Sequence, residues 1–218
     1  MEFPTTKQMR KILIVEDHPI FRRGLKNILA DTQRFTLGEA EDANRATQLL
    51  RKERWDVMVL DIGLPGKGGL EFIKEVKLAD PKLPVLVLSV QSGEQYAIRM
   101  LKAGASGYLT KERTPEELLI ALGKLLAGKK YLTESVAERV VAQLEPGAHT
   151  SALQLLSDRE FEVLGMIARG LPPKEICARL HISPRTVSTY RARLLKKLNL
   201  ENNAQLVQYA MENRLIEE

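Results

Sequence analysis

The stretch VMVLDIGLPGKGGLE, residues 57–71, decides the fold of this chain. An apolar run leads to one carboxylate, Asp61, and a loop rich in Gly and Pro follows at once. Apolar runs without alternation are typical of parallel strands that are covered on both faces, and Gly and Pro mark the turn that ends them. The stretch therefore predicts a buried strand that ends at an acidic side chain.

Similar short runs alternate with helical patterns over the first 128 residues. This alternation favours right-handed βαβ crossovers and a parallel five-stranded sheet with helices on both faces, an α/β architecture. Strands are predicted at 11–15, 34–38, 56–60, 84–88 and 106–110. Helices are predicted near 19–31, 42–53, 69–79, 92–103 and 114–128.

The second part of the chain is predicted to be all helical. The pattern loosens over residues 128–156, where a helix is expected at 133–144 and a linker at 145–151. Ser157 with Glu160 forms the sequence of a capping box, so a helix should begin there. Four helices are predicted within 156–170, 172–181, 183–198 and 202–215.

Composition places the chain among intracellular proteins that do not span a membrane. Apolar residues make up 44% and charged residues 28% of the chain, as in ordinary globular proteins. No apolar run approaches the roughly 18 residues of a membrane span, and the N-terminal segment does not resemble a signal peptide. The single cysteine, Cys177, fits a reducing compartment.

Polar residues follow four of the predicted strands and should meet at one edge of the sheet. They are Glu16, Asp17, Asp61, Ser89 and Lys111. Ligands of doubly wound α/β domains lie beyond the carboxyl ends of the strands. Three neighbouring carboxylates repel one another unless a cation is present, and oxygen ligands of this kind favour Mg²⁺.

Such a site suits the transfer of a phosphoryl group to Asp61. A carboxylate can act as the nucleophile, while Mg²⁺ and Lys111 neutralise the transferring oxygens and Ser89 donates a hydrogen bond to the attached group. A single Asp at a strand end is most often only a turn former. Five polar groups that suit one phosphoryl site lie at the ends of four strands, which argues against Asp61 being only a turn former.

A second pattern, near the C-terminal end, points to DNA. Seven basic residues stand against one acid between Lys174 and Lys197. A helix over 184–198 would turn Val187 and Leu194 inward and present a basic face of small residues outward, as a recognition helix does in the major groove. A solvated amphipathic helix is the alternative. The residues that we expect to contact DNA are Arg185, Thr186, Ser188, Thr189, Ala192, Arg193 and Lys196.

These motifs together resemble a known family over nearly the whole chain. The segments ILIVEDHP, VLDIGLPGKGGLE, LSV and AGASGYLTK resemble the receiver domain of two-component response regulators. The segment SPRTVSTYRARLLKKLNL with the helices before it resembles a LuxR-type helix-turn-helix. Both sets in this order resemble the NarL/FixJ class of transcription regulators.

The resemblance implies a role for each residue of the predicted site. Asp61 would be the phosphoacceptor, and a partner histidine kinase would supply the phosphoryl group. The expected Mg²⁺ ligands are Glu16, Asp17, Asp61 and the backbone carbonyl of Gly63. The expected phosphoryl-binding and switch residues are Ser89, Tyr108 and Lys111.

The resemblance also implies an organisation in three parts. We expect a flavodoxin-like (βα)5 receiver at 9–128, a linker with a helix at 129–152, and a four-helix DNA-binding domain at 153–218. The protein would be a cytoplasmic regulator and not an enzyme. Its partners would be the kinase, promoter DNA and, as a candidate, RNA polymerase. The phosphorylated form would be a homodimer that pairs through Val207 and Met211.

Three departures from the family pattern stand out. Gly68 replaces an Asp, Asn or Ser of many receivers, which we interpret as a change in a turn. Val90 replaces a small residue and is predicted to narrow the approach to Asp61. Pro172 and Pro173 replace the polar N-cap of a helix, which should therefore lack a side-chain cap.

Two other functions share some of these features. A phosphatase with an aspartyl nucleophile also uses Mg²⁺ and a strand-end Asp, but it needs a second Asp as general acid where this chain has Gly63. A regulator that works without phosphate is the other alternative, and the complete set of five polar groups argues against it.

Overall fold

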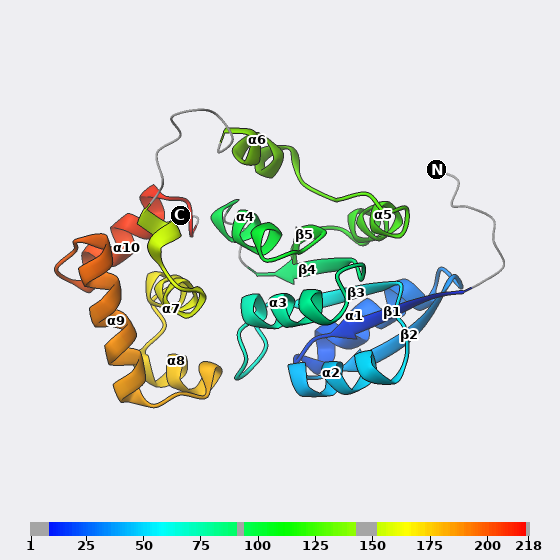
Figure 1. Cartoon of the computed structure of the whole chain (residues 1–218), viewed down its shortest axis with the longest axis horizontal. Coiled ribbons are helices and arrows are strands. Elements are labelled where there is room, and N and C mark those ends of the chain that lie inside the picture. Colours follow the sequence, from blue (N-terminus) through cyan, green and yellow to red (C-terminus); the bar gives the residue numbers. More distant parts are fainter. Residues whose placement is uncertain (1–8, 91–93, 143–151, 217–218) are drawn as a thin grey trace.

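The computed structural model describes residues 9–90, 94–142 and 152–216. Its first half contains a five-stranded parallel sheet in the order β2-β1-β3-β4-β5 (Figure 1). The strands are β1 (Arg10–Val15), β2 (Phe35–Ala40), β3 (Val57–Asp61), β4 (Val85–Ser89) and β5 (Gly107–Thr110). Register places Asp61 opposite Leu88 and Ser89 opposite Thr110, so the carboxyl ends of these strands share one edge.

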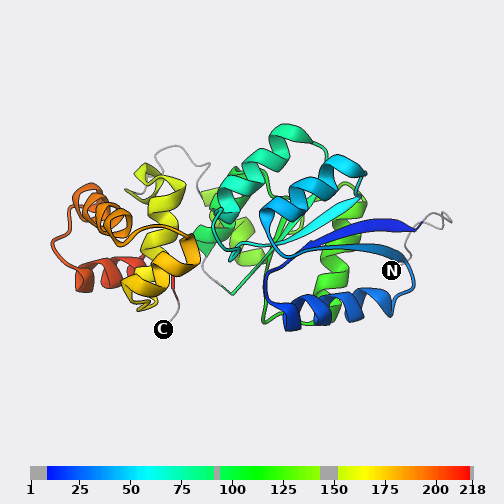
Figure 2. The ribbon, with the colours of Figure 1, turned by 90° about the horizontal axis from the view of Figure 1, so that it is seen from below.

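Helices cover both faces of this sheet (Figure 2). Residues of α1 and α5 pack on one face, and residues of α2, α3 and α4 pack on the other. These helices are α1 (Pro19–Ala30), α2 (Ala43–Lys52), α3 (Gly69–Ala79), α4 (Glu94–Lys102) and α5 (Pro115–Leu126). Because β3 and β4 lie between the two layers, every one of their residues is buried, which is why their sequences show no polar alternation.

The C-terminal part of the chain is helical. It follows α6 (Glu134–Ala142), which packs against α4. Its elements are a 3₁₀ turn, η1 (Ala152–Leu155), and the helices α7 (Asp158–Ala168), α8 (Pro173–Leu180), α9 (Pro184–Leu198) and α10 (Asn203–Glu212). Both α8 and α9 end at a residue with positive φ, His181 and Asn199, so each helix stops sharply and the chain can turn.

Local capping explains where these helices begin. Ser157 and Glu160 form the predicted capping box of α7, and the Ser183 side chain accepts a hydrogen bond from the Thr186 amide at the start of α9. Helix α8 begins after Pro172 without a side-chain cap, as predicted.

The predicted fold class is confirmed, with most element bounds within about two residues. The 3₁₀ turn η1 was not predicted, because four residues carry no period that could be recognised. The predicted linker at 145–151 lies outside the described residues. Within the described ranges, no helix is both long and apolar enough to cross a membrane.

The sheet-bearing part and the helical part pack against each other through α4 and α7. The rings of Tyr96 and Phe161 lie 4.7 Å apart between centroids and are tilted by 60°. One cluster of buried apolar residues runs from the sheet through α3 and α4 into α7, α9 and α10. The two parts therefore share a continuous core, which the sequence patterns did not predict.

Candidate functional site

Three carboxylates gather at the carboxyl edge of the sheet. Glu16 and Asp17 follow β1, and Asp61 is the last residue of β3. Together with His18 they can offer ligand atoms that all lie within 4.8 Å of one another. Glu16 is fully buried and Asp61 is 4% exposed. The sheet thus brings the predicted acidic residues together.

Lys111 closes this cluster from the end of β5. Its Nζ atom lies 2.6 Å from Oε2 of Glu16 and 2.8 Å from Oδ2 of Asp61. The ammonium also lies over the ring of Phe21, 4.4 Å from the ring centroid. One cation therefore neutralises part of the charge of two buried carboxylates.

The charge balance of the cluster remains negative. Burial and the charge of Asp61 raise the pKa of Glu16, and the hydrogen bond from Lys111 opposes this rise. A further cation at the cluster would stabilise the ionised carboxylates in the same way. The electrostatics of this edge therefore favour a bound cation.

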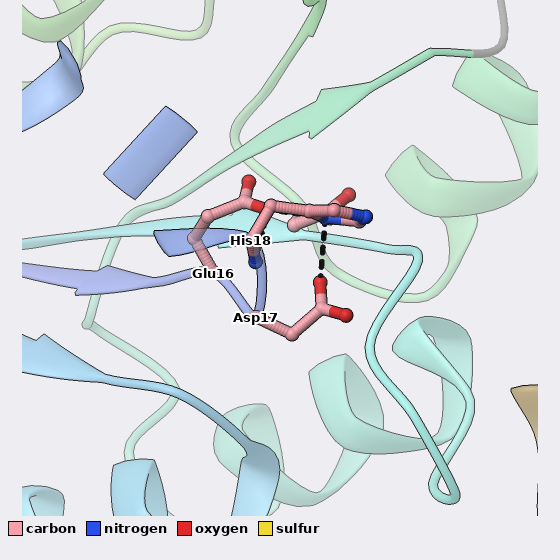
Figure 3. A group of neighbouring side chains, drawn as sticks. Glu16, Asp17 and His18 are labelled. Atoms are coloured by element: carbon pink, nitrogen blue, oxygen red, sulfur yellow. Dashed lines mark hydrogen bonds and ion pairs between the residues drawn. The ribbon is translucent and has the colours of Figure 1, made fainter. Parts of the chain in front are cut away.

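One oxygen of Asp17 is a candidate ligand for such a cation. Oδ1 of Asp17 is buried, lies 3.0 Å from Nδ1 of His18, and accepts no hydrogen bond from the described residues. Figure 3 shows the Asp17 carboxylate facing the His18 ring beside Glu16. A buried carboxylate oxygen that accepts no hydrogen bond is a suitable ligand for a hard divalent ion such as Mg²⁺.

The loop after Asp61 folds back onto the carboxylate. The amide of Gly63 donates a hydrogen bond of 3.0 Å to Oδ1 of Asp61. A methyl group at Gly63 would come to 3.3 Å from Oδ2 of the same carboxylate. Gly63 thus lies beside Asp61, and its role as a carbonyl ligand stays a prediction.

Ser89 and Tyr108 contact each other on the neighbouring strands. Ser89 is fully buried at the end of β4, and Tyr108 on β5 is 5% exposed. Burial raises the pKa of Tyr108, and a hydrogen bond with the Ser89 side chain opposes this effect. The Tyr108 ring is therefore already inside the domain while Lys111 binds Asp61. Val90, by contrast, is 69% exposed, and its effect on access to Asp61 stays a prediction.

The predicted recognition helix, α9, presents its outer face to solvent. Val187 and Leu194 are buried on its inner side, as the helical projection predicts. The hydroxyl groups of Ser188 and Thr189 donate to backbone carbonyls one turn earlier, at 3.0 and 2.9 Å. The exposed residues of the predicted outer face are Arg185, Ser188, Thr189, Ala192, Arg193 and Lys196, and Thr186 is half-buried.

The structure separates the basic residues of α9 into two groups. Nε of Arg191 donates to Oδ1 of Asn203 at 2.5 Å, and Lys197 binds the buried Glu160 at 2.7 Å. In the described parts of the chain, Arg185, Arg193 and Lys196 make no ion pair within 4.0 Å. The first group stabilises the domain, and the second group is available to an anionic partner.

The predicted pairing surface lies on α10. Leu206 and Ala210 are fully buried against the rest of the domain. Val207 is half-buried, and Met211 is 39% exposed. The apolar surface left over on this helix is therefore small and is centred on Met211.

Sequence reasoning missed two features of the site. His18 belongs to the acidic cluster, and its place directly after Glu16 and Asp17 was the available signal. Gly68 was interpreted as a change in a turn, and this interpretation is incomplete. A methyl group at Gly68 would overlap the Glu162 carboxylate of α7, so the glycine accommodates a contact between domains.

Comparison with known proteins agrees with this geometry. Residues 12–123 match the response regulator receiver domain, and residues 154–210 match the luxR family of bacterial regulatory proteins. The response regulator UvrY of Escherichia coli is 32% identical over 95% of this chain and 96% of its own. A putative transcriptional regulator of Pseudomonas aeruginosa is 39% identical over 95% of this chain and 100% of its own.

A similar solved structure was determined in complex with DNA. RcsB from Salmonella enterica serovar Typhimurium, bound to promoter rprA in the presence of the phosphomimetic BeF3⁻, has a TM-score of 0.65 and 28% identity. The match covers 93% of this chain and 98% of RcsB. The chain belongs to the two-component response regulators of the NarL/FixJ class, which join a receiver domain to a LuxR-type DNA-binding domain.

Proposed function

We propose that phosphorylation of Asp61 by a partner histidine kinase controls the binding of this protein to promoter DNA. The arrangement of Lys111, Glu16 and Asp61 carries this proposal, because a buried cation already bridges the carboxylate that would accept the phosphoryl group. The same carboxylate is exposed at 4%, so only a small group can reach it.

Each residue of the cluster has a part in the proposed reaction. A carboxylate oxygen of Asp61 would attack the phosphorus of the kinase phosphohistidine, the P–N bond would break and the imidazole would leave. Lys111 would stabilise negative charge on the transferred oxygens. Glu16, Asp17 and Asp61, with the Gly63 carbonyl, would hold Mg²⁺, which would supply positive charge against the phosphoryl oxygens. Ser89 would donate a hydrogen bond to the attached group while keeping its contact with Tyr108.

Two observations favour this reading over catalytic turnover. The position two residues after Asp61 is Gly63, so that position supplies no general acid for a leaving group. The family of the chain consists of transcription regulators. We therefore propose that the protein carries the phosphoryl group and does not act as an enzyme.

The experiment is a comparison of phosphate incorporation with phosphatase turnover. A small phosphodonor with Mg²⁺ should leave one acid-labile phosphate per chain, and Asp61→Asn should abolish it. Asp17→Asn should abolish the dependence on Mg²⁺. Labelling that persists in Asp61→Asn would overturn the assignment, and steady hydrolysis of a phosphomonoester would favour the phosphatase.

The DNA-binding part of the proposal rests on α9. Its exposed face offers Arg185, Arg193 and Lys196 to phosphates or bases. RcsB, which is similar to this chain over 93% of its length, has been solved on promoter DNA. We infer the same partner for this chain, with two copies on inverted half-sites and RNA polymerase as a candidate further partner.

The proposed organisation keeps the bounds expected from the sequence. The receiver would span 9–128, the linker 129–152 and the DNA-binding domain 153–218. A regulator that binds chromosomal DNA works where the chromosome lies, so we place the protein in the bacterial cytoplasm.

A further inference from the structure

The DNA-binding domain holds the loop that follows Asp61. At the middle of this loop, the amide of Gly66 donates a 3.0 Å hydrogen bond to the backbone carbonyl of Arg179, at the end of α8. The guanidinium of Arg159, on α7, donates to the carbonyl of Gly66. Both hydrogen-bonding groups of one receiver residue are therefore satisfied by the other domain.

Two glycines allow the domains to come this close. A methyl group at Gly165 of α7 would overlap the hydroxyl of Tyr96, and one at Gly68 would overlap the Glu162 carboxylate. Burial raises the pKa of Tyr96 to about 12, and Arg169 at the end of α7 opposes this rise. Each domain thus supplies one glycine that receives a side chain of the other.

Charged contacts surround these two glycines. Asp158 of α7 binds Nζ of Lys74 at 2.5 Å and the guanidinium of Arg99 at 3.2 Å. Arg99 also lies over the ring of Phe161, 4.5 Å from its centroid, and donates to the carbonyl of Leu153. These contacts bind α7 to α3 and α4, but they do not touch the loop after Asp61.

We propose that Arg159 is a positioning residue for the cation and phosphoacceptor site of the receiver, acting through Gly66. The inference rests on the proposed function of Asp61. Residues 62–68 carry Gly63, whose amide binds Asp61 and whose carbonyl is the expected ligand. A loop that is fixed at its middle has lost part of its conformational freedom before the cation arrives, so binding is opposed by less entropy.

This arrangement makes cation binding and domain docking favour each other. If docking orders the loop and the ordered loop binds Mg²⁺ more tightly, bound Mg²⁺ must strengthen docking by the same factor. The DNA-binding domain would then support the receiver's metal site without supplying a ligand to it.

The test is a titration of the full chain with Mg²⁺ alone. The NMR chemical shifts of the Ile62 and Gly63 amides are the readout. Arg159→Ala should weaken Mg²⁺ binding on the order of tenfold, which is typical of partners that support a metal ligand. Lys74→Ala is the matched control. It removes another basic side chain from the same interface, but its ion pair with Asp158 is largely exposed to solvent, so the domains should stay docked and the affinity for Mg²⁺ should not change.

A second variant opens the interface without touching Arg159. Gly165→Ala places a methyl group against Tyr96, while alanine inside α7 favours the helix and keeps the DNA-binding domain folded. It should weaken Mg²⁺ binding to the same degree. The double variant should be no weaker than either single variant, because both act through docking.

The outcomes separate this inference from the proposed function. Unchanged affinity in Arg159→Ala and Gly165→Ala, with normal binding to the parent protein, would overturn the role of Arg159 alone. Equal losses in Arg159→Ala and Lys74→Ala would also overturn it, because the loss would then not depend on the hydrogen bond from Arg159 to Gly66. A parent protein whose Gly63 amide does not respond to Mg²⁺ would contradict the proposed function itself.

Discussion

Lys111 and Asp61 form a buried ion pair with 2.8 Å between Nζ and Oδ2, and Glu16 shares the same ammonium at 2.6 Å. Only 10% of the Lys111 side chain and 4% of the Asp61 side chain are exposed. Two buried carboxylates therefore depend on one cation. Removing one partner of such a cluster leaves uncompensated charge in a place that water reaches poorly.

Lys111→Met should therefore destabilise the receiver. We expect a loss of about 3 kcal/mol in the free energy of unfolding without Mg²⁺, in line with other buried ion pairs that lose one partner. Mg²⁺ should recover part of this loss, since a second cation would then neutralise Glu16 and Asp61. Urea unfolding with and without MgCl₂ measures both effects, and a loss that is identical in the two conditions would contradict a cation site at this cluster.

The hydrogen bond between Ser89 and Tyr108 should couple phosphorylation to DNA binding. Ser89→Ala removes the hydroxyl that contacts both Tyr108 and the proposed phosphoryl group, while Asp61 and Lys111 stay in place. Phosphate incorporation should continue, and its stimulation of DNA binding should fall. Binding to promoter DNA before and after treatment with a phosphodonor measures this, and full stimulation in Ser89→Ala would place the switch elsewhere.

Two adjacent lysines of α9 should behave differently. Lys196 is exposed, so Lys196→Ala should weaken binding to every DNA sequence and reduce the slope of log K against log salt by about 0.9. Lys197 binds Glu160, so Lys197→Ala should keep the slope and lower stability by about 1–2 kcal/mol. Salt titrations and urea unfolding of both variants check the pair, and a reduced slope in Lys197→Ala would contradict the separation.

The sequence preference of α9 should depend on Thr189. Its hydroxyl donates to the Arg185 carbonyl, and a rotation about χ1 would turn the hydroxyl toward a base edge. Thr189→Ala should therefore change which sites are preferred more than it changes overall affinity. Selection from a pool of random DNA sites would show this. An unchanged consensus would exclude Thr189 from base contacts.

Pairing through α10 should be sensitive to a charge at its exposed apolar position. Met211→Lys places a cation where two copies would meet, so binding to an inverted repeat should lose cooperativity while a single half-site is bound as before. Sedimentation of the phosphorylated protein and footprints on both kinds of site measure this. Cooperative binding by Met211→Lys, or binding to direct repeats only, would contradict the predicted surface.

The sheet and the acidic cluster were predictable because short-range patterns determine them. Strands β3 and β4 are buried on both faces, so their apolar runs identify them directly. Parallel strands bring their carboxyl ends to one edge, so Asp61, Ser89 and Lys111 could be placed together without knowing any side-chain contact. Caps such as Ser157 and Ser183 marked the helix starts for the same local reason.

The contacts between the domains were not predictable in this way. Gly68 is next to α3 in the sequence, but the side chain that lies against it is Glu162, on a helix of the other domain. A contact between residues so far apart leaves no periodic pattern in one sequence. Tyr96 posed the same problem, since its apolar ring suits a receiver core as well as an interface with Phe161.

The continuous core limits how freely this chain can exchange its parts with relatives. Phe161 is 1% exposed, and the ring against it belongs to Tyr96 of the receiver. A chimera that joins this DNA-binding domain to another receiver would leave Phe161 facing water unless the new receiver carries an aromatic residue at the position of Tyr96. Successful grafts should therefore transfer Tyr96, Gly68, Phe161 and Gly165 as one unit, although these residues lie in two different domains.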